Sequence, residues 1–228
     1  MRVIIGGSSG FGRYAVLQAL KNGLDVMYTY RRQPIEAVYT NFAVGGSLNS
    51  VMCDLTDQSQ IEALADVLLN QEKEITELLF CAAEHSDRKK FTEFTNEEFF
   101  RIFQVNVFAT CDVIRRIIPK LKSSQPSSIV ILSSQVSRTG GFRIYPYAMS
   151  KGALDTMALS LSKELVEHGI RLNLVSPGQI VPSENHILRK LPSGAVSYQK
   201  LHEVIQNFFD GSERDENGNN VFFNNSTI

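Results

Sequence analysis

Short apolar runs alternate along this chain with longer segments whose apolar residues recur at helical spacing. Six of the runs are apolar throughout rather than at every second position, as is typical of strands that helices cover on both faces. They occupy residues 3–5, 25–30, 50–53, 77–82, 128–132 and 170–175. Alternation of such strands with helices predicts an α/β fold, with a doubly wound parallel sheet in a single domain of three layers.

The length and composition fit one packed domain. The chain has 228 residues, of which 43% are hydrophobic and 21% are charged, enough for a substantial core. We expect a single domain over residues 1–228, in which residues 179–228 form a short substrate lid and a last strand. A formal net charge of −1 argues against a protein that coats nucleic acid or an anionic membrane.

Cysteine, histidine and hydrophobic patterns bear on location and on metal binding. Cys53, Cys81 and Cys111 are too few and too far apart for a disulfide framework or a CxxC metal site. The four histidines show no metal-ligand spacing. No apolar run approaches the roughly 20 residues of a membrane span, and the first residues lead directly into a strand. We therefore expect a cytoplasmic protein with no metal, no nucleic-acid partner and no membrane partner.

Thr95 and Glu98 have the spacing of a capping box, which predicts the start of a long helix that runs to about Leu121. Its apolar residues, Phe100 and Phe108 among them, lie on more than one side, so the helix must be covered from two directions. One interpretation is a deep core helix. The interpretation that we favour is a homodimer or homotetramer through residues 95–121 and 150–167.

A glycine-rich turn follows the first strand and opens a helix. Its candidate cofactor residues are Gly6, Ser8, Ser9, Gly10, Phe11 and Gly12. Glycines allow a tight turn and a close approach to a pyrophosphate, which the free N–H groups and dipole of the new helix favour. Gly12 lets the helix pack closely against the sheet. The motif between strand and helix indicates a dinucleotide site and a Rossmann-type sheet.

Gly6, Ser8 and Gly10 also match the nucleophile elbow of α/β-hydrolases. That site needs an oxyanion-hole N–H from a loop after an earlier strand. Because no earlier strand precedes residue 8, the esterase interpretation is disfavoured.

Two arginines, Arg31 and Arg32, follow the second strand about 20 residues beyond the glycines. An acidic residue at this point would bind the ribose 2′-hydroxyl of NAD. Arginine instead suits a 2′-phosphate, because its planar fork of donors fits phosphate oxygens. A solvated pair of loop arginines is the alternative, and we favour NADP(H) over NAD(H).

Tyr147 and Lys151 lie four residues apart on a segment with helical spacing and so share one helix face. An ammonium about 4–5 Å from the phenol would lower the tyrosine pKa by a unit or two and make Tyr147 a candidate general acid. Ser134 lies 13 residues earlier, at the carboxyl end of a strand, where open parallel sheets bind ligands. Asn106 is a polar amide among apolar helical neighbours and needs a partner or a role.

Together these motifs resemble the classical short-chain dehydrogenases/reductases over residues 1 to about 182. The glycine turn, Asn106, Ser134, Tyr147 and Lys151 match that family's pattern in type and order. The cofactor set that the resemblance implies extends beyond the residues already named, to Asp54, Leu55, Cys81, Ala82, Ala83, Pro177, Gly178 and Ile180. Of the family's Asn-Asn-Ala-Gly motif after the fourth strand, this chain keeps only Ala83.

The resemblance implies a role for each matched residue. Tyr147 would give a proton to the substrate carbonyl oxygen, which Ser134 would hold. Lys151 would bind the nicotinamide ribose and lower the tyrosine pKa. Asn106 would hold a kinked helix and a water of the proton relay, and Asp54 would bind the adenine amine.

Three positions depart from the family pattern. Ile5 stands where the family has threonine, and Glu84 replaces the glycine after Ala83. Only Ser183 could stand in for the threonine that follows the Pro-Gly turn. Glu84 and His85 lie either at the substrate mouth or at a solvated loop end, and we favour the loop end.

These observations predict an NADPH-dependent oxidoreductase that reduces a ketone or other carbonyl to an alcohol, or runs the reverse reaction. The alternative is a protein of the same fold that binds NADP and serves sensing or assembly with little turnover. Apolar residues in the segments beyond residue 134, such as Phe142 and Leu188, favour a small-molecule substrate with apolar surface.

Overall fold

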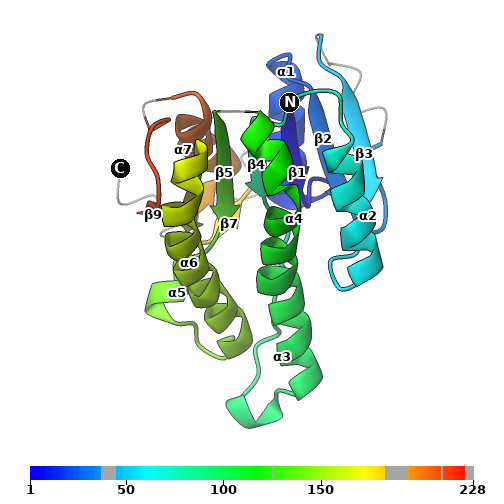
Figure 1. Ribbon diagram of the computed structural model, residues 1–228. Helices are drawn as coiled ribbons and strands as arrows, with labels where there is room; N and C mark the ends of the chain where they lie inside the picture. The colour runs from blue at the N-terminus through cyan, green and yellow to red at the C-terminus, as the bar shows by residue number, and fades with distance from the viewer. Residues whose placement is uncertain (37–44, 125, 183–194, 212, 224–228) are drawn as a thin grey trace.

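A seven-stranded parallel sheet forms the centre of the computed structural model, which describes residues 1–36, 45–124, 126–182, 195–211 and 213–223 (Figure 1). The strand order is β3-β2-β1-β4-β5-β6-β9, and every neighbouring pair is parallel. The strands are β1 (Arg2–Ile5), β2 (Val26–Tyr30), β3 (Leu48–Met52), β4 (Glu77–Phe80), β5 (Ser127–Leu132), β6 (Ile170–Pro177) and β9 (Asn220–Phe223). The predicted doubly wound parallel sheet is confirmed.

The order of the strands reverses at β1, which pairs with β2 on one side and β4 on the other. The chain proceeds outward from β1 to β3 and then returns to β4. Because the loops that leave β1 and β4 diverge at this point, a crevice opens at their carboxyl ends. The fold therefore places the glycine turn after β1 beside the loop after β4.

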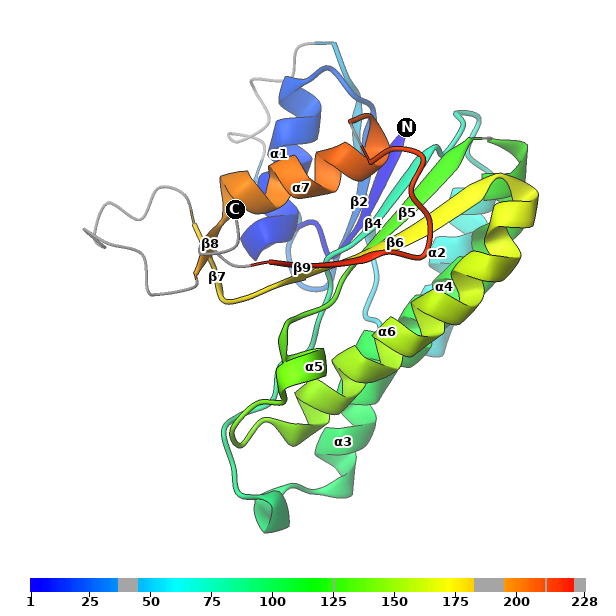
Figure 2. The same ribbon diagram turned by 90° about the vertical axis from the view of Figure 1, so that its left-hand side faces the viewer.

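Helices cover both faces of the sheet (Figure 2). One face carries α1 and α7, whose apolar residues pack with buried side chains such as Ile4 and Val130. The other face carries α2, α4 and α6 over residues such as Val3 and Ile129. The bounds of these helices are α1 (Gly10–Lys21), α2 (Gln58–Leu69), α4 (Ala109–Ser123), α6 (Tyr145–Leu165) and α7 (Tyr198–Phe209).

The edge strand β3 is the exception to full coverage. Asn49, Ser50 and Met52 are exposed, so the prediction that every strand is covered on both faces is wrong for β3. The edge of a sheet has a neighbour on one side only, and polar residues there keep the strand in water. The central strands β1 and β2 are buried nearly throughout, as predicted.

The predicted long helix consists of three helical segments in direct succession. They are α3 (Asn96–Phe103), the π-helical turn η3 (Gln104–Phe108) and α4. The capping box is confirmed, since the Thr95 N–H donates to Glu98 at 2.9 Å and the Glu98 N–H donates to Thr95 Oγ1 at 3.3 Å. The wider π turn inserts a local irregularity into the helix, as π-bulges do, and Asn106 lies within it.

Several short elements have no counterpart in the predicted pattern. A two-stranded parallel sheet joins β7 (Ile180–Val181) to β8 (Val196–Ser197). The helical turns η2 (Phe91–Glu93), α5 (Val136–Thr139) and η4 (Val166–His168) lie in connections. Such elements span too few residues to give a periodic signal. Within the described ranges, the helices are too short or too polar to cross a bilayer.

Candidate active site

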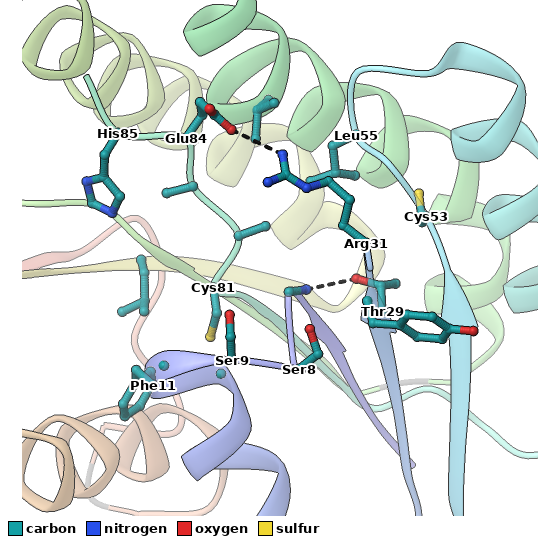
Figure 3. Close-up of a pocket in the computed structure, with 18 of the residues that line it drawn as sticks. Ser8, Ser9, Phe11, Thr29, Arg31, Cys53, Leu55, Cys81, Glu84 and His85 are labelled. Atoms are coloured by element: carbon teal, nitrogen blue, oxygen red, sulfur yellow. Dashed lines mark hydrogen bonds and ion pairs between the residues drawn. The ribbon is translucent and has the colours of Figure 1, made fainter. Parts of the chain in front are cut away.

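A pocket of about 430 Å³ opens at the carboxyl edge of β1, β2 and β4 (Figure 3). The predicted cofactor residues that line it are Gly6, Ser8, Ser9, Gly10, Phe11, Gly12, Arg31, Asp54, Leu55, Cys81, Ala82, Ala83 and Ile180. Further residues of the lining are Thr29, Tyr30, Cys53, Glu84, His85, Val105, Leu132 and Tyr198. The predicted residues Arg32, Tyr147, Lys151, Pro177 and Gly178 lie outside this lining.

The glycine turn forms the floor of the pocket, and two of its glycines are sterically required. Gly6 has a φ of +85°, and a Cβ there would lie 2.7 Å from the Cα of Ala82. A Cβ on Gly12 would lie 2.1 Å from the Gly6 carbonyl oxygen. The helix therefore begins directly over the turn, with N–H groups available for an anion.

Thr29 fixes the turn from the neighbouring strand. The Gly6 N–H donates to Thr29 Oγ1 at 2.8 Å (Figure 3), and the Gly7 N–H donates to the Thr29 carbonyl at 3.0 Å. Thr29 is the penultimate residue of β2 and is buried. Its side chain supports the floor of the pocket.

Asp54 lies at the Arg31 side of the pocket. Its Oδ1 accepts hydrogen bonds from the N–H of Thr56 at 2.9 Å and from the Thr56 hydroxyl at 2.8 Å. Burial opposes ionisation of this carboxyl, but the Thr56 hydrogen bonds and the charges of Arg31 and Arg101 outweigh it and lower the pKa of Asp54. Arg32 is exposed and does not line the pocket.

Glu84 joins the loop after β4 to two arginines. Its Oε2 lies 3.4 Å from Arg31 Nη1, and its Oε1 lies 3.1 Å from Arg101 Nε. Figure 3 shows the pair with Arg31 beside the pocket. The favoured expectation of a solvated loop end is wrong for Glu84, because the strand order brings residues 31 and 84 to the same edge of the sheet.

Asn106 holds the backbone of this same loop. Its Oδ1 accepts from the Glu84 N–H at 2.7 Å, and its Nδ2 donates to the Glu84 carbonyl at 3.0 Å and to Ser150 Oγ at 2.9 Å. The side chain is buried, and its three hydrogen bonds satisfy the amide. The carbonyl of Asn106 accepts from the Thr110 hydroxyl at 3.2 Å.

Ser134, Tyr147 and Lys151 meet next to the pocket. The side chains of Ser134 and Tyr147 are hydrogen bonded. Lys151 is buried and donates to the carbonyl of Leu132, a pocket residue, at 2.8 Å. Its Nζ lies 5.7 Å from the centre of the Tyr147 ring. Helix α6 and the end of β5 thus bring together Ser134, Tyr147 and Lys151, the first and last of which lie 17 positions apart in the sequence.

The prediction that Lys151 lowers the pKa of Tyr147 is wrong for this structure. Burial raises the pKa of Tyr147 to about 12, and the hydrogen bond with Ser134, which lowers this pKa, only partly offsets the effect of burial. Burial also lowers the pKa of Lys151 to about 8, while the charges of Asp155 and Cys81 oppose this change. Desolvation outweighs attraction here because the ammonium is directed at the Leu132 carbonyl rather than at the phenol.

His85 also lines the pocket rather than lying only at a solvated loop end. Its ring stands 4.7 Å from that of Tyr147, centre to centre, at an angle of 32°. Burial lowers the pKa of His85, and the charge of Lys151 adds to this effect while Glu84 opposes it. A neutral imidazole therefore contacts the candidate acid at neutral pH.

A comparison with protein families matches residues 1–190 to the short-chain dehydrogenase model. The chain belongs to the short-chain dehydrogenase family. This membership confirms the resemblance that the motifs indicated, and with it an oxidoreductase family that uses a nicotinamide cofactor.

The chain is similar to individual oxidoreductases of this family. It is 30% identical to the uncharacterised oxidoreductase YhxC of Bacillus subtilis, with 78% of the chain and 63% of the relative covered. Identity is 26% with the NADPH-dependent pterin aldehyde reductase of Arabidopsis thaliana, over 78% of the chain and 74% of the relative. The chain thus spans slightly less than two thirds of the length of YhxC.

Among solved structures, the fold resembles the NADH-dependent reductase A1-R′ in complex with NAD. The TM-score is 0.85 at 22% identity, and the alignment covers 100% of this chain and 96% of the reductase. At this identity the match establishes the shared fold.

Sequence reasoning missed several pocket residues of this short-chain dehydrogenase. Thr29 was hidden inside an apolar strand, although it lies two residues before Arg31. Tyr198 comes from α7, and its ring meets that of Phe11 at 5.7 Å, edge to face. Ser183, the suggested stand-in for the family threonine, lies outside the described residues.

Proposed function

We propose that this short-chain dehydrogenase is an NADPH-dependent oxidoreductase that reduces a ketone or other carbonyl to an alcohol, or runs the reverse reaction. The observation that carries the proposal is the position of Ser134, Tyr147 and Lys151 directly beside the glycine-floored pocket. A candidate proton donor and a candidate dinucleotide-binding pocket lie at the same edge of the sheet, as hydride transfer to a carbonyl requires.

The pocket suits a dinucleotide on steric and electrostatic grounds. Gly6 and Gly12 line the pocket, and a side chain at either position would clash with Ala82 or with the Gly6 carbonyl, so glycine is needed for the turn to pack tightly under the start of α1. The glycine turn and the start of α1 would hold the pyrophosphate, and Arg31 would hold a 2′-phosphate. Asp54 and Leu55 would contact the adenine, and Lys151 the nicotinamide ribose. When bound, the cofactor supplies the hydride.

The protein's own residues would supply orientation and the proton. Ser134 would donate a hydrogen bond to the substrate oxygen, and the Tyr147 O–H would protonate that oxygen. A phenol with a pKa of about 12 is protonated at neutral pH, which suits the reduction direction. Asn106 would keep the π turn and the adjacent loop in place.

The test of the mechanism is NADPH oxidation over a panel of ketones and aldehydes. We expect turnover by the wild type and a loss of about 100-fold or more in Tyr147→Phe, in the range typical of a missing general acid. Equal rates for wild type and variant would refute the mechanism. NADPH binding without turnover on any carbonyl would favour the sensing or assembly alternative.

The preference for NADP rests on Arg31. We expect Arg31→Ala to weaken NADPH binding much more than NADH binding, because only NADPH carries the phosphate that the guanidinium contacts. Equal losses for the two cofactors would contradict this part of the proposal. Arg32→Ala is the matched control and should leave both affinities close to those of the wild type.

We also propose a homodimer or homotetramer through the outer faces of α3, α4 and α6. Phe100 on α3, Phe108 in the π turn that leads into α4, and Met149 and Leu159 on α6 are each at least half exposed. Large apolar side chains that gather into an exposed patch mark protein–protein interfaces. Light scattering of the wild type should give a mass of two or four times the 25.5 kDa of one chain, and Phe108→Asp should lower that mass.

The segment 179–228 would serve as a short substrate lid and last strand of one domain over residues 1–228. Its support is that Ile180 and Tyr198 both line the pocket. The three cysteines are free in the described structure, and we keep the cytoplasm as the proposed location.

A further inference from the structure

The ion pair between Arg31 and Glu84 joins the two sides of the pocket. Arg31 follows β2 and Glu84 lies in the loop after β4, while β1 and its glycine turn lie between those strands. In Figure 3 the two side chains point toward one another from these opposite sides. The contact is 3.4 Å long, and both side chains are partly exposed at 39% and 26%. A ligand can therefore reach and compete for either group.

The charge of Arg31 is already compensated at this site. Glu84 contacts Arg31 with one carboxylate oxygen and Arg101 with the other. Asp54 lies near enough for both arginines to lower its pKa. Two carboxylates thus face two guanidinium groups, and a phosphate that approaches Arg31 also approaches the carboxylate of Glu84.

We infer that Glu84 sets the cofactor selectivity of this site, by competing with the cofactor's 2′-phosphate for Arg31. This inference rests on the proposed function, in which Arg31 receives that phosphate. Glu84 thereby reduces the preference for NADPH that Arg31 confers. NADH presents a hydroxyl in place of the phosphate and meets no such repulsion, since a hydroxyl can donate a hydrogen bond to a carboxylate.

The size of the effect follows from the charges. A 2′-phosphate carries about −1.5 to −2 charges at neutral pH. At a separation of about 6 Å in a water-like dielectric, loss of one opposing carboxylate charge should tighten binding of the phosphate about five- to tenfold. Exposed pairs such as this one are screened by salt, so the effect should shrink as ionic strength rises.

The backbone of Glu84 is held independently of its side chain. Asn106 makes hydrogen bonds to both the N–H and the carbonyl of Glu84. Glu84→Gln therefore changes the charge while the loop keeps its support and the side chain keeps its size. Asp87→Asn is the matched control, because Asp87 is an exposed carboxylate of the same loop and its substitution changes net charge equally.

The experiment measures the affinities of NADPH and NADH by nucleotide fluorescence for the wild type, Glu84→Gln and Asp87→Asn at low and moderate salt. We expect Glu84→Gln to tighten NADPH binding about five- to tenfold at low salt and to leave the NADH affinity within about twofold of the wild type. The gain in NADPH affinity should be smaller at higher salt. Asp87→Asn should leave the ratio of the two affinities unchanged. Unchanged selectivity in Glu84→Gln, or an equal shift in both variants, would overturn the inference.

A second variant separates this inference from the proposed function. In an Arg31→Ala background, Glu84→Gln should change the NADPH affinity less than it does in the wild type, because the two side chains interact. If Arg31→Ala weakens NADPH binding but Glu84→Gln leaves it unchanged, the inference is refuted while the proposed function stands. Failure of the wild type to bind either nucleotide would refute the proposed function and the inference together.

Discussion

Asn106 offers a test of how the site is assembled, because one buried amide connects the π turn to the loop after β4. Its side chain makes three hydrogen bonds, two of them to the backbone of Glu84 and one to Ser150, at 2.7 to 3.0 Å. Asn106→Ala removes all three and leaves the Glu84 N–H and carbonyl without these partners. The substitution should therefore affect both stability and the pocket.

The expected loss of stability can be worked from those contacts. A hydrogen bond contributes a net value of about 1 kcal/mol, so Asn106→Ala should lower the free energy of unfolding by about 3 kcal/mol. For a domain of this size, that corresponds to a fall in Tm of about 6–12 °C. Urea unfolding followed by circular dichroism measures the first quantity, and a thermal scan measures the second.

Asn173→Ala is the matched control. Asn173 is equally buried, and its side chain donates to the Glu216 carbonyl at 2.7 Å and accepts from the Asn219 N–H at 3.0 Å. It lies on β6 and does not line the pocket. We expect it to lower stability by about 2 kcal/mol and to leave NADPH affinity unchanged, whereas Asn106→Ala should weaken NADPH binding as well.

Two outcomes would refute this reasoning. A loss of less than about 1 kcal/mol in Asn106→Ala would mean that the loop does not depend on these hydrogen bonds. Equal effects of Asn106→Ala and Asn173→Ala on NADPH affinity would mean that Asn106 has no particular link to the pocket.

Two further predictions test the floor of the site and the buried lysine. Gly12→Ala should weaken NADPH binding about tenfold or more, because the added Cβ would lie 2.1 Å from the Gly6 carbonyl oxygen. Gly152→Ala is the control and should leave the affinity unchanged, because its Cβ would lie 3.8 Å from the nearest atom outside its own helix backbone. Titration of both variants with NADPH measures the two affinities. The pKa of Lys151 is about 8 in the folded protein, below the 10.5 of an ordinary lysine. Between pH 8 and pH 10.5 the unfolded chain therefore binds more protons than the folded one, and folding becomes more favourable as the pH rises. The stability of the wild type relative to Lys151→Met should thus increase by up to about 3 kcal/mol from neutral pH to about pH 10.5, and a constant difference across that range would contradict the assignment.

The parts of the fold and site that follow from local chemistry could be predicted from the sequence. Gly6 and Gly12 are required by the steric limits of a strand that turns directly into a helix, and the structure shows those limits. The Thr95 and Glu98 pair needs only a spacing of three residues. The central strands could be recognised in the sequence because both of their faces are buried, which makes them apolar throughout.

Other features depend on which residues the fold brings together. Arg31 and Glu84 lie 53 positions apart and meet only because β2 and β4 flank β1. The raised pKa of Tyr147 comes from burial, which a spacing of four residues to Lys151 does not reveal. The pattern at residues 95–121 indicated a helix but not the π turn around Asn106, because a single wider turn hardly changes the apolar periodicity.

The most direct measurement of the central claim is an equilibrium titration of the wild type with NADPH and with NADH. We expect saturable binding of both nucleotides, with NADPH bound more tightly, and loss of that preference in Arg31→Ala. Absence of binding of either nucleotide would contradict the assignment of the pocket and, with it, the proposed function.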